Sequence, residues 1–299
     1  MALQIRPMTS TIGAHITGID LAQEVSADDL EKIRRVWNDY LIIVFPGQHE
    51  LTPSQHIRFA RHFGKLEVSS SLNSFAHPEY PEIFLLSNEK KEHGHSETRD
   101  VGWTWHTDLT FSKRPAAGAA LHARKIPRIG GDTMFANLEA AYASLSPAYQ
   151  AMLKDLWLIH DHRLTLWQQR RDNQKLEKNS DEFVKKNFPV RHPMVRYHPE
   201  TGRPSLLVGQ SFNKQIHGMT EAESRPILQY LLEHATQAEF VYRHHWNVGD
   251  LLMWDNRSTM HRVVADHDAE PEENRDDKLR ILHRVTLLGE HDTGIEVES

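Results

Sequence analysis

Residues 101–136 read VGWTWHTDLTFSKRPAAGAALHARKIPRIGGDTMFA, and this stretch sets the fold class. It holds three short runs of β-branched, aromatic and small apolar residues, which Pro or Gly residues separate. Runs of this length between turn residues predict short β-strands. Similar runs occur at residues 40–45 (YLIIVF), 251–255 (LLMWD) and 278–289 (KLRILHRVTLLG). The sequence therefore predicts a mainly β protein with a sandwich or barrel core and flanking helices.

The helices are expected outside this core. Residues 26–40 (SADDLEKIRRVWNDY) begin with a serine and acidic residues and then repeat apolar residues at helical spacing. Thr52 and Thr220 each open the order of a capping box, with Gln or Glu three residues later. No linker rich in Gly, Ser or Pro divides the chain, so we expect a single domain over residues 1–299. Within it, the highly charged residues 146–187 are expected to form a helical or irregular insertion and a candidate lid.

The composition excludes several classes of site and partner. Lys plus Arg number 35 and Asp plus Glu 41, and the resulting net charge of −6 disfavours nucleic acid as a partner. The absence of cysteine excludes disulfides, thiolate zinc sites, iron–sulfur clusters and cysteine nucleophiles. No apolar run reaches the roughly 18 residues of a membrane span, and the first residues do not resemble a signal peptide. We therefore expect a cytoplasmic location and no membrane partner.

Histidine is abundant, with 21 residues, and a metal site is the first hypothesis. Four His-x-acid pairs occur, close to the roughly three expected by chance: His77/Glu79, His95/Glu97, His106/Asp108 and His198/Glu200. Only His106 and Asp108 lie in a strand-like run, where residues i and i+2 point to the same face. A second histidine would complete the ligand set of a non-haem Fe(II) oxygenase. His261, His244 and His245 are all candidates, and periodicity does not choose among them; a hydrogen-bonded core histidine at position 106 is the alternative.

The last predicted strand carries arginines. Strict alternation gives it two faces: Arg280, Leu282, Arg284 and Thr286 on one, and Ile281, His283, Val285 and Leu287 on the other. An arginine that points into a core is costly unless an anion meets it. The strand therefore either lies at a sheet edge with solvated arginines or places them beside a bound anion.

Four motifs occur in the order in which a known enzyme family carries them: WHTDLTF (105–111), GGDT (130–133), WDNRSTMHR (254–262) and RILHRVT (280–286). They resemble the Fe(II)/2-oxoglutarate dioxygenases of the taurine dioxygenase and 2,4-dichlorophenoxyacetate dioxygenase family, and the C-terminal third is closer to the phenoxyacetate branch. The resemblance covers nearly the whole chain. It implies a double-stranded β-helix (jelly-roll) core and an oxidoreductase that uses Fe(II), 2-oxoglutarate and O₂, releases succinate and CO₂, and hydroxylates a small molecule.

The resemblance also implies roles for individual residues. His106, Asp108 and His261 would bind the iron, and Arg280 and Thr133 would bind the distal carboxylate of 2-oxoglutarate. Arg284 would meet the anionic group of the substrate, and further substrate contacts are implied at Ser69, Leu72, Leu109, Leu166 and Phe212. Relatives are commonly dimers or tetramers, so a homo-oligomer is expected.

Departures from the family pattern bear on the substrate. Ser69 stands where taurine dioxygenases have a histidine for the sulfonate, and Leu72 and Leu166 replace a pocket Tyr and Phe. A roomier, less polar pocket favours an aryloxyalkanoate-like carboxylate, hydroxylated next to its heteroatom, over taurine. The alternatives are an alkylsulfonate dioxygenase of the same mechanism, a non-catalytic metal-binding β-barrel, and a zinc hydrolase with two His and one Asp. The segment between His261 and Arg280 is also longer than the family usually shows.

Overall fold

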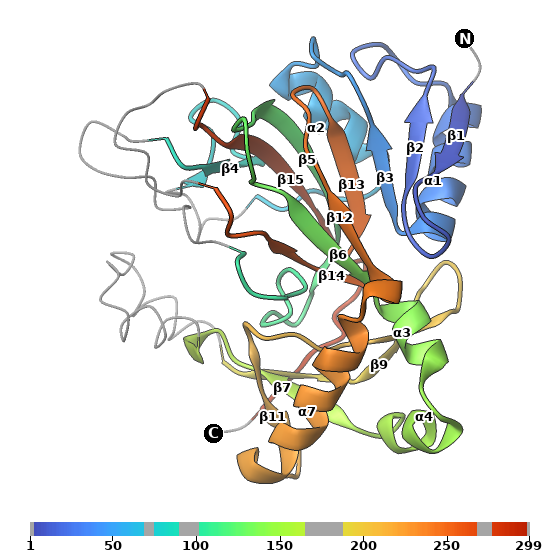
Figure 1. Ribbon diagram of the computed structural model, residues 1–299, viewed down its shortest axis with the longest axis vertical. Helices are drawn as coiled ribbons and strands as arrows, with labels where there is room; N and C mark the ends of the chain where they lie inside the picture. The colour runs from blue at the N-terminus through green and yellow to red at the C-terminus, as the bar shows by residue number, and fades with distance from the viewer. Residues whose placement is uncertain (1–2, 69–74, 90–101, 165–187, 268–276, 298–299) are drawn as a thin grey trace.

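The computed structural model describes residues 3–68, 75–89, 102–164, 188–267 and 277–297. Two β-sheets lie at its centre (Figure 1). The larger has seven strands in the order β1 (Gln4–Pro7), β2 (Ala14–Thr17), β3 (Ile42–Phe45), β13 (Leu251–Asp255), β5 (Ala116–Lys125), β15 (Ile281–Leu288) and β4 (Ile83–Ser87). The smaller has three, in the order β12 (Val241–His244), β6 (Thr133–Asn137) and β14 (Thr259–Val263). This β-rich pair of sheets confirms the predicted jelly-roll core.

The two sheets pack against each other through large apolar side chains. The ring centroids of Phe135 on β6 and Trp254 on β13 lie 5.7 Å apart, and both side chains are buried. Along β13 the side chains alternate, so that Leu252 and Trp254 face this core while Leu251 and Met253 face the helices outside. Burial of both faces explains why the strand reads as an unbroken apolar run.

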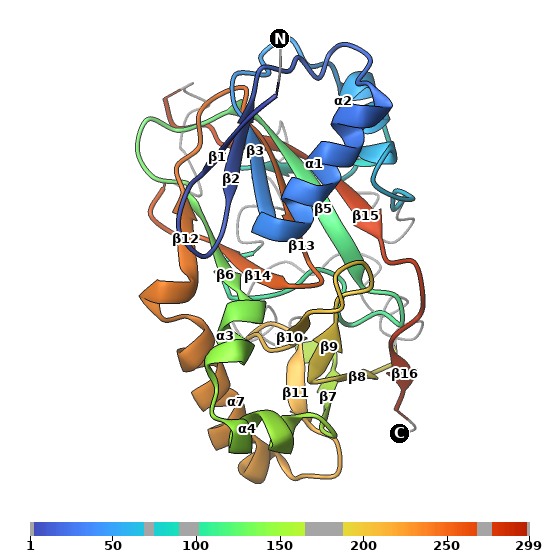
Figure 2. The same cartoon turned by 90° about the vertical axis from the view of Figure 1, so that its right-hand side faces the viewer.

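Helices α1 (Ala27–Tyr40) and α2 (Pro53–Arg61) cover the outer face of the larger sheet (Figure 2). Ser26 caps α1 by accepting a hydrogen bond from the backbone N–H of Asp29, and Thr52 forms a capping box with Gln55 at the start of α2. Both caps confirm the sequence prediction. Trp37 and its neighbours on the two helices pack against the outward side chains of β13 and β15, which fixes the larger sheet in place.

A second group of elements lies beside the sheets. It comprises α3 (Leu138–Ser144), α4 (Pro147–Leu153), β7 (Trp157–His160), β8 (Val190–Pro193), β9 (Val195–Tyr197), β10 (Pro204–Leu206), β11 (Asn213–Ile216), α7 (Glu221–Ala235), η2 (Ala238–Phe240) and β16 (Ile295–Glu296). Thr220 caps α7 with the predicted capping box. The predicted insertion at residues 146–187 contains α4, but residues 157–160 form a strand, whose backbone pairs with β8 on one side and with β11 on the other. Residues 165–187, which make up most of the insertion and of the candidate lid, lie outside the described residues.

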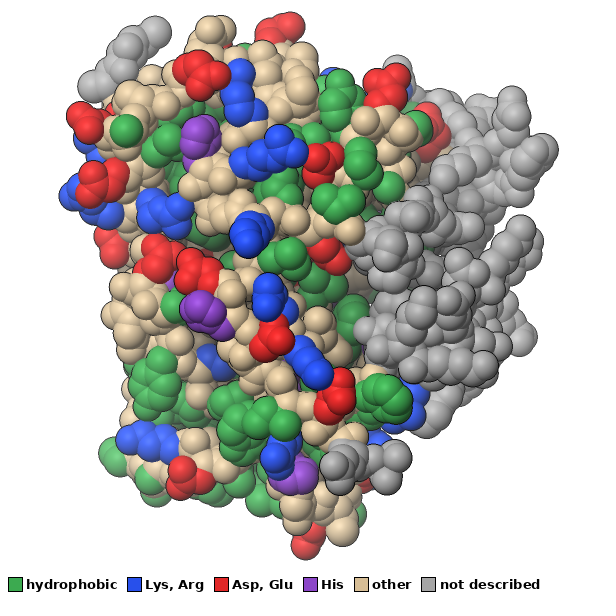
Figure 3. Space-filling view, turned by 180° about the vertical axis from the view of Figure 1, so that it is seen from behind, with side chains coloured by type: hydrophobic (Ala, Val, Ile, Leu, Met, Phe, Trp, Pro, Cys, Tyr) green, Lys and Arg blue, Asp and Glu red, His purple; other side chains and the backbone are tan. Residues whose placement is uncertain are grey.

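The charged surface is mixed in sign on the face that Figure 3 shows, where acidic and basic side chains alternate over short distances. Within the described ranges, no helix is long and apolar enough to cross a membrane.

Candidate active site

Two histidines and one aspartate meet beside the smaller sheet. One ligand atom from each of His106, Asp108 and His261 lies within 4.8 Å of the others, and this is the one such cluster among the described residues. His261 lies on β14, and His106 pairs with it through two backbone hydrogen bonds of 3.0 and 2.8 Å. All three side chains are buried. The structure thus brings together the pair expected at residues 106 and 108 and one of the three candidate partners.

The local structure around this pair differs from the prediction. Residues 103–111 do not form a strand: His106 makes an isolated bridge to His261, and the chain turns at Asp108. Leu109 adopts a left-handed backbone conformation with φ of 56°. His106 and Asp108 therefore lie where the chain leaves its bridge to His261 and enters a turn, and not on one face of a regular strand.

The other candidate histidines lie elsewhere. His244 on β12 is buried, with its Nδ1 3.1 Å from the hydroxyl of Tyr242. His245 is largely exposed, with its Nδ1 2.8 Å from a carboxylate oxygen of Asp132. Neither belongs to the cluster with His106.

The protonation states of the cluster suit a divalent cation. His106 Nδ1 lies 2.7 Å from the carbonyl oxygen of Thr104, which only accepts, so Nδ1 carries the proton and Nε2 keeps its lone pair. Burial, reinforced by His106, lowers the pKa of His261 to about 3, which keeps this imidazole neutral. Burial alone would raise the pKa of Asp108, but Arg284 and the two histidines outweigh it and lower the pKa to about 2.

The spacing of the ligand atoms also suits a single divalent cation. Nε2 of His106 lies 3.8 Å from Oδ1 of Asp108, and Nε2 of His261 lies 3.9 Å from Oδ2. The other nitrogen of His261, Nδ1, is buried without a hydrogen-bond partner in the described structure. Two imidazoles and one carboxylate facing one another are the donor set of a non-haem Fe(II) site.

Arg280 forms a buried cationic site at the start of β6, the strand that pairs with β14 and His261. Burial lowers its pKa to about 10, so the guanidinium stays charged at neutral pH. Its Nε donates to the carbonyl oxygen of Gly131 (2.9 Å) and one terminal nitrogen lies 3.4 Å from Oγ1 of Thr133. Within the described residues, no carboxylate lies within ion-pair distance of it. A buried guanidinium without a carboxylate partner is suited to bind an anion.

The loop before β6 is shaped to let this arginine approach. Gly131 has φ of 78°, and a Cβ there would lie 3.1 Å from Cδ of Arg280. Arg243 holds the loop from outside through ion pairs of 2.6 Å with Asp132 and 2.5 Å with Asp266. The GGDT motif thus supplies both close backbone approach and the Thr133 hydroxyl.

Arg284 contacts the cluster itself. Its terminal nitrogen lies 3.1 Å from Oδ1 of Asp108, and its guanidinium lies 4.7 Å from the ring centroid of Phe84. The strand that carries it, β15, is central: it pairs with β5 on one side and β4 on the other. The alternative that this strand lies at a sheet edge with solvated arginines is therefore wrong. The prediction that the strand has two distinct faces is confirmed, since Val285 and Leu287 pack towards the helices.

Aromatic side chains lie on another side of the cluster. Phe111, His162 and Phe212 form a group with ring centroids 4.5 to 5.7 Å apart, and each is partly exposed. The ring of Phe212 lies 6.5 Å from that of His106. Of the predicted substrate contacts, Phe212 thus lies beside the cluster, and Leu109 is partly buried one residue after Asp108.

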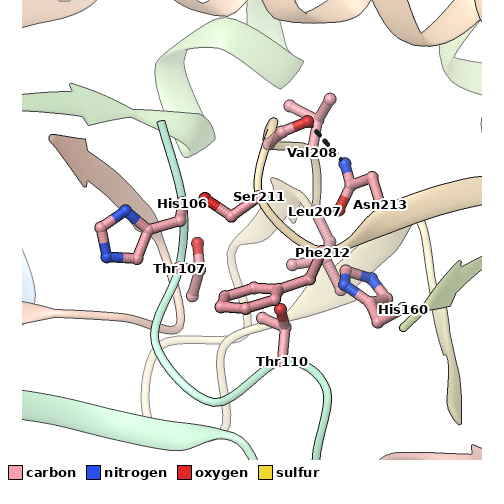
Figure 4. Close-up of a pocket in the computed structure, with 10 residues that line it drawn as sticks. His106, Thr107, Thr110, His160, Leu207, Val208, Ser211, Phe212 and Asn213 are labelled. Carbon is pink, nitrogen blue, oxygen red and sulfur yellow. Dashed lines mark hydrogen bonds between the residues drawn. The ribbon is translucent and has the colours of Figure 1, made fainter. Parts of the chain in front are cut away.

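The remaining predicted substrate contacts are Ser69, Leu72 and Leu166, and all three lie outside the described residues. A narrow crevice beside the cluster is lined by His106, Phe212 and His160 (Figure 4).

Three residues of the site had no role assigned from the sequence: His162, Asn256 and Phe111, the last quoted only within WHTDLTF. His162 was not singled out, and its only signal was its position next to Asp161 at the end of a strand. Asn256 was quoted within WDNRSTMHR but given no role, although its side chain bonds to Asp108. Residue patterns do not reveal contacts between segments so far apart in the chain.

The sequence and the structure of this chain are similar to those of known dioxygenases. Residues 4–286 match the model of the taurine catabolism dioxygenase TauD, TfdA family. The chain is 35% identical over 274 residues to the alpha-ketoglutarate-dependent 2,4-dichlorophenoxyacetate dioxygenase of Cupriavidus pinatubonensis (88% of this chain, 92% of that one). It is 32% identical over 300 residues to an alkylsulfatase of Acinetobacter baylyi (98% and 87%).

The crystal structure of AAD-2 in complex with Mn(II) and N-oxalylglycine is similar along its whole length. The TM-score is 0.80 at 31% identity, and the match covers 100% of both chains. A family model that matches almost the full length and relatives above 30% identity agree with the cluster of two histidines and one aspartate. The chain belongs to the TauD/TfdA family and is an Fe(II)- and 2-oxoglutarate-dependent dioxygenase that consumes O₂.

Proposed function

We propose that His106, Asp108 and His261 bind the Fe(II). The support is their convergence, the neutral state of His261 and the ionised state of Asp108. Bound iron, with 2-oxoglutarate and O₂, supplies the oxidising power that hydroxylates a C–H bond, and succinate and CO₂ are the other products. The family favours this interpretation over a zinc hydrolase or a non-catalytic barrel.

We propose that Arg280 and Thr133 bind the distal carboxylate of 2-oxoglutarate. The hydroxyl oxygen of Thr133 already lies within hydrogen-bond distance of two donors, Nε1 of Trp246 at 3.0 Å and Arg280 at 3.4 Å. Its own proton is therefore left to donate to an incoming acceptor. A fixed fork of guanidinium donors beside that hydroxyl matches the two oxygens of a carboxylate.

The proposed substrate is an aryloxyalkanoate-like monocarboxylate. The observation that carries this is the placement of a cation and of aromatic rings beside the cluster: Arg284 contacts Asp108, and Phe212 lies next to His106. Arg284 would bind the carboxylate, and Phe111, His162 and Phe212 would pack against the aryl ring. Hydroxylation of the carbon next to the ether oxygen gives a hemiacetal or hemiketal, which breaks into a phenol and an oxo acid.

A sulfate ester or sulfonate is the second candidate. The similarity to an alkylsulfatase over 98% of the chain favours it, since Arg284 would suit a sulfate monoanion as well as a carboxylate. Hydroxylation next to the ester oxygen would release sulfate and leave an aldehyde. A taurine-type substrate has less support because Ser69 replaces the sulfonate-binding histidine.

The test follows 2-oxoglutarate consumption and product formation together. Iron-loaded enzyme is supplied in parallel with phenoxyacetate, hexyl sulfate, taurine and methyl phenoxyacetate, and succinate, phenol and sulfate are measured. We expect phenol and succinate in equal amounts from phenoxyacetate and little product from its neutral methyl ester. Faster, coupled sulfate release from hexyl sulfate would replace the carboxylate proposal by the sulfate-ester proposal.

A cytoplasmic location and a dimeric or tetrameric assembly are further proposals, which rest on the sequence composition and on the family. Size-exclusion chromatography with light scattering tests the assembly, and a mass of 34.6 kDa would contradict it. The single-domain organisation over residues 1–299 also stays a prediction. A single unfolding transition in calorimetry would support it.

A further inference from the structure

Asn256 lies fully buried directly behind the carboxylate of Asp108. Its Nδ2 donates a hydrogen bond to Oδ2 of Asp108 (3.3 Å), and its Oδ1 accepts one from the backbone N–H of Asp108 (3.4 Å). The amide side chain therefore grips the aspartate at two points, one on the carboxylate and one on the backbone. Asn256 follows β13, whereas Asp108 lies 148 positions earlier in the chain.

The orientation of this amide is fixed by its other neighbours. Nε1 of Trp254 donates to Oδ1 of Asn256 at 3.1 Å. The indole N–H and the backbone N–H of Asp108 are both donors, so the side-chain atom that faces them must be the amide oxygen. The NH₂ group is thereby directed to the carboxylate.

The backbone of Asn256 is held as well. Its N–H donates to the carbonyl oxygen of Ala117 (3.0 Å), and its carbonyl oxygen accepts from the guanidinium of Arg196 (3.0 Å). Both backbone groups and both side-chain polar atoms of Asn256 are therefore hydrogen-bonded, and a change of rotamer would break the side-chain bonds. Asn256 is a rigid support and not an adaptable one.

The two oxygens of Asp108 have different partners. Oδ1 contacts Arg284, and Oδ2 contacts Asn256. Arg284 is the proposed partner of the substrate anion, so its contact with Asp108 is expected to change when substrate binds. Asn256 is neutral and buried, and nothing in the proposed reaction competes for its amide.

We propose that Asn256 is a positioning residue, which holds Asp108 in the conformation that binds metal and thereby sets the metal affinity independently of substrate. This inference rests on the proposed assignment of Asp108 as an iron ligand. Groups that orient metal ligands typically contribute about 10- to 100-fold to metal affinity. The loss of Asn256 should therefore weaken metal binding in that range without altering the cosubstrate site around Arg280.

The experiment measures Mn(II) binding to metal-free protein from the electron paramagnetic resonance signal of the unbound ion. Variants are Asn256→Ala, Asn256→Ser, Asp108→Ala and the control Asn137→Ala. Asn137 is a matched control because it is also a buried asparagine with two side-chain hydrogen bonds, to the carbonyl oxygen of Thr11 and from the N–H of Ala140, and it contacts no residue of the cluster. Thermal unfolding of each protein reports how far stability alone has changed.

The expected result is a Kd for Mn(II) raised about 10- to 100-fold in Asn256→Ala and Asn256→Ser. Asn137→Ala should lower the unfolding midpoint and leave the Kd for Mn(II) unchanged. At saturating Mn(II), the Kd for 2-oxoglutarate should stay within about threefold in both Asn256 variants, since Arg280 and Thr133, which are proposed to bind its distal carboxylate, are unchanged.

Two outcomes would overturn the inference. The first is an unchanged Kd for Mn(II) in a folded Asn256 variant; the second is an equal rise in Asn137→Ala, which would indicate a general loss of stability. The Asp108→Ala variant separates the positioning role of Asn256 from the proposal that Asp108 binds the metal. Mn(II) binding that persists in Asp108→Ala contradicts the ligand assignment itself, whereas binding lost there but kept in Asn256→Ala contradicts only the positioning role.

Discussion

The replacement Arg280→Met tests the cosubstrate site because stability and binding should move in opposite directions. In the cosubstrate-free protein, Arg280 is a buried cation, 6% exposed, whose described side-chain hydrogen bonds go to neutral oxygens of Gly131 and Thr133. Replacing such a charge by an apolar side chain of similar length is often neutral or stabilising. The unfolding midpoint of metal-free Arg280→Met should therefore equal or exceed that of the wild type.

Binding of 2-oxoglutarate should weaken strongly in the same variant. Removing one partner of a buried charge pair costs about 2–5 kcal/mol, and each 1.4 kcal/mol is a factor of ten, so the loss lies between roughly 30-fold and several thousand-fold. Thr133 and the metal would still hold the cosubstrate, which favours the lower end. We expect the Kd for 2-oxoglutarate to rise about 30- to 100-fold. The Kd of Arg280→Lys should lie between those of Arg280→Met and the wild type, because lysine keeps the positive charge but lacks the paired N–H donors of the guanidinium.

The assay is a calorimetric titration of Mn(II)-loaded protein with 2-oxoglutarate under nitrogen. Arg284→Met serves as the comparison, since Arg284 is assigned to the substrate and should alter cosubstrate binding much less. A Kd for Arg280→Met within threefold of the wild type would refute the reasoning. So would a larger loss in Arg284→Met, which would exchange the roles of the two arginines.

Three further outcomes are expected. Burial lowers the pKa of His122 and His192 to about 4, from about 6.5 in the unfolded chain. The unfolded state therefore binds more protons, and the free energy of unfolding falls as the pH falls from 6.5 towards 4. Each histidine should lower it by about 2 kcal/mol at pH 5, and an unfolding midpoint that is constant between pH 7 and 5 would contradict this. Arg243→Met should raise the Kd for 2-oxoglutarate about two- to fivefold, because its partly exposed ion pairs hold the loop that contacts Arg280; the same titration measures it, and an unchanged Kd would show that the loop keeps its shape without them. Gly118→Ala should lower the free energy of unfolding, measured by urea denaturation, by about 1–3 kcal/mol, since its Cβ would lie 2.6 Å from the carbonyl oxygen of Trp254. A urea midpoint equal to that of the wild type would mean that the sheet accommodates the methyl group without loss of stability.

Local signals in the sequence predicted helices α1, α2 and α7 and the central strands, whereas α3 was not predicted. Ser26, Thr52 and Thr220 cap helices as expected because a cap depends on residues three positions apart. The run at residues 251–255 forms β13 because both faces of that strand are buried. The insertion was predicted less well, since strand β7 depends on pairing with β8 and β11, which lie farther along the chain.

The cluster was predicted only in part for the same reason. The sequence favoured His106 with Asp108 but placed them on a strand, whereas the chain turns and Leu109 takes a left-handed conformation. Periodicity left His261, His244 and His245 open, because the choice depends on which strand pairs with residue 106. Only the family resemblance selected His261, and the backbone bridge between His106 and His261 supports that selection.

The charges that line the site bear on what substrate it accepts. Asp108 contributes one negative charge, and Arg280 and Arg284 contribute two positive charges; a divalent metal ion adds two more. The dianion 2-oxoglutarate cancels two of the resulting three positive charges. A monoanionic substrate next to Arg284 cancels the last, so a carboxylate or sulfate ester leaves the loaded site neutral, whereas a neutral ester leaves a buried positive charge uncompensated. Because uncompensated buried charge is costly, the site should discriminate against neutral analogues more strongly than between anions of similar size. Arg284→Gln should relax this discrimination, and a persistent preference for phenoxyacetate over its methyl ester in that variant would place the anion elsewhere.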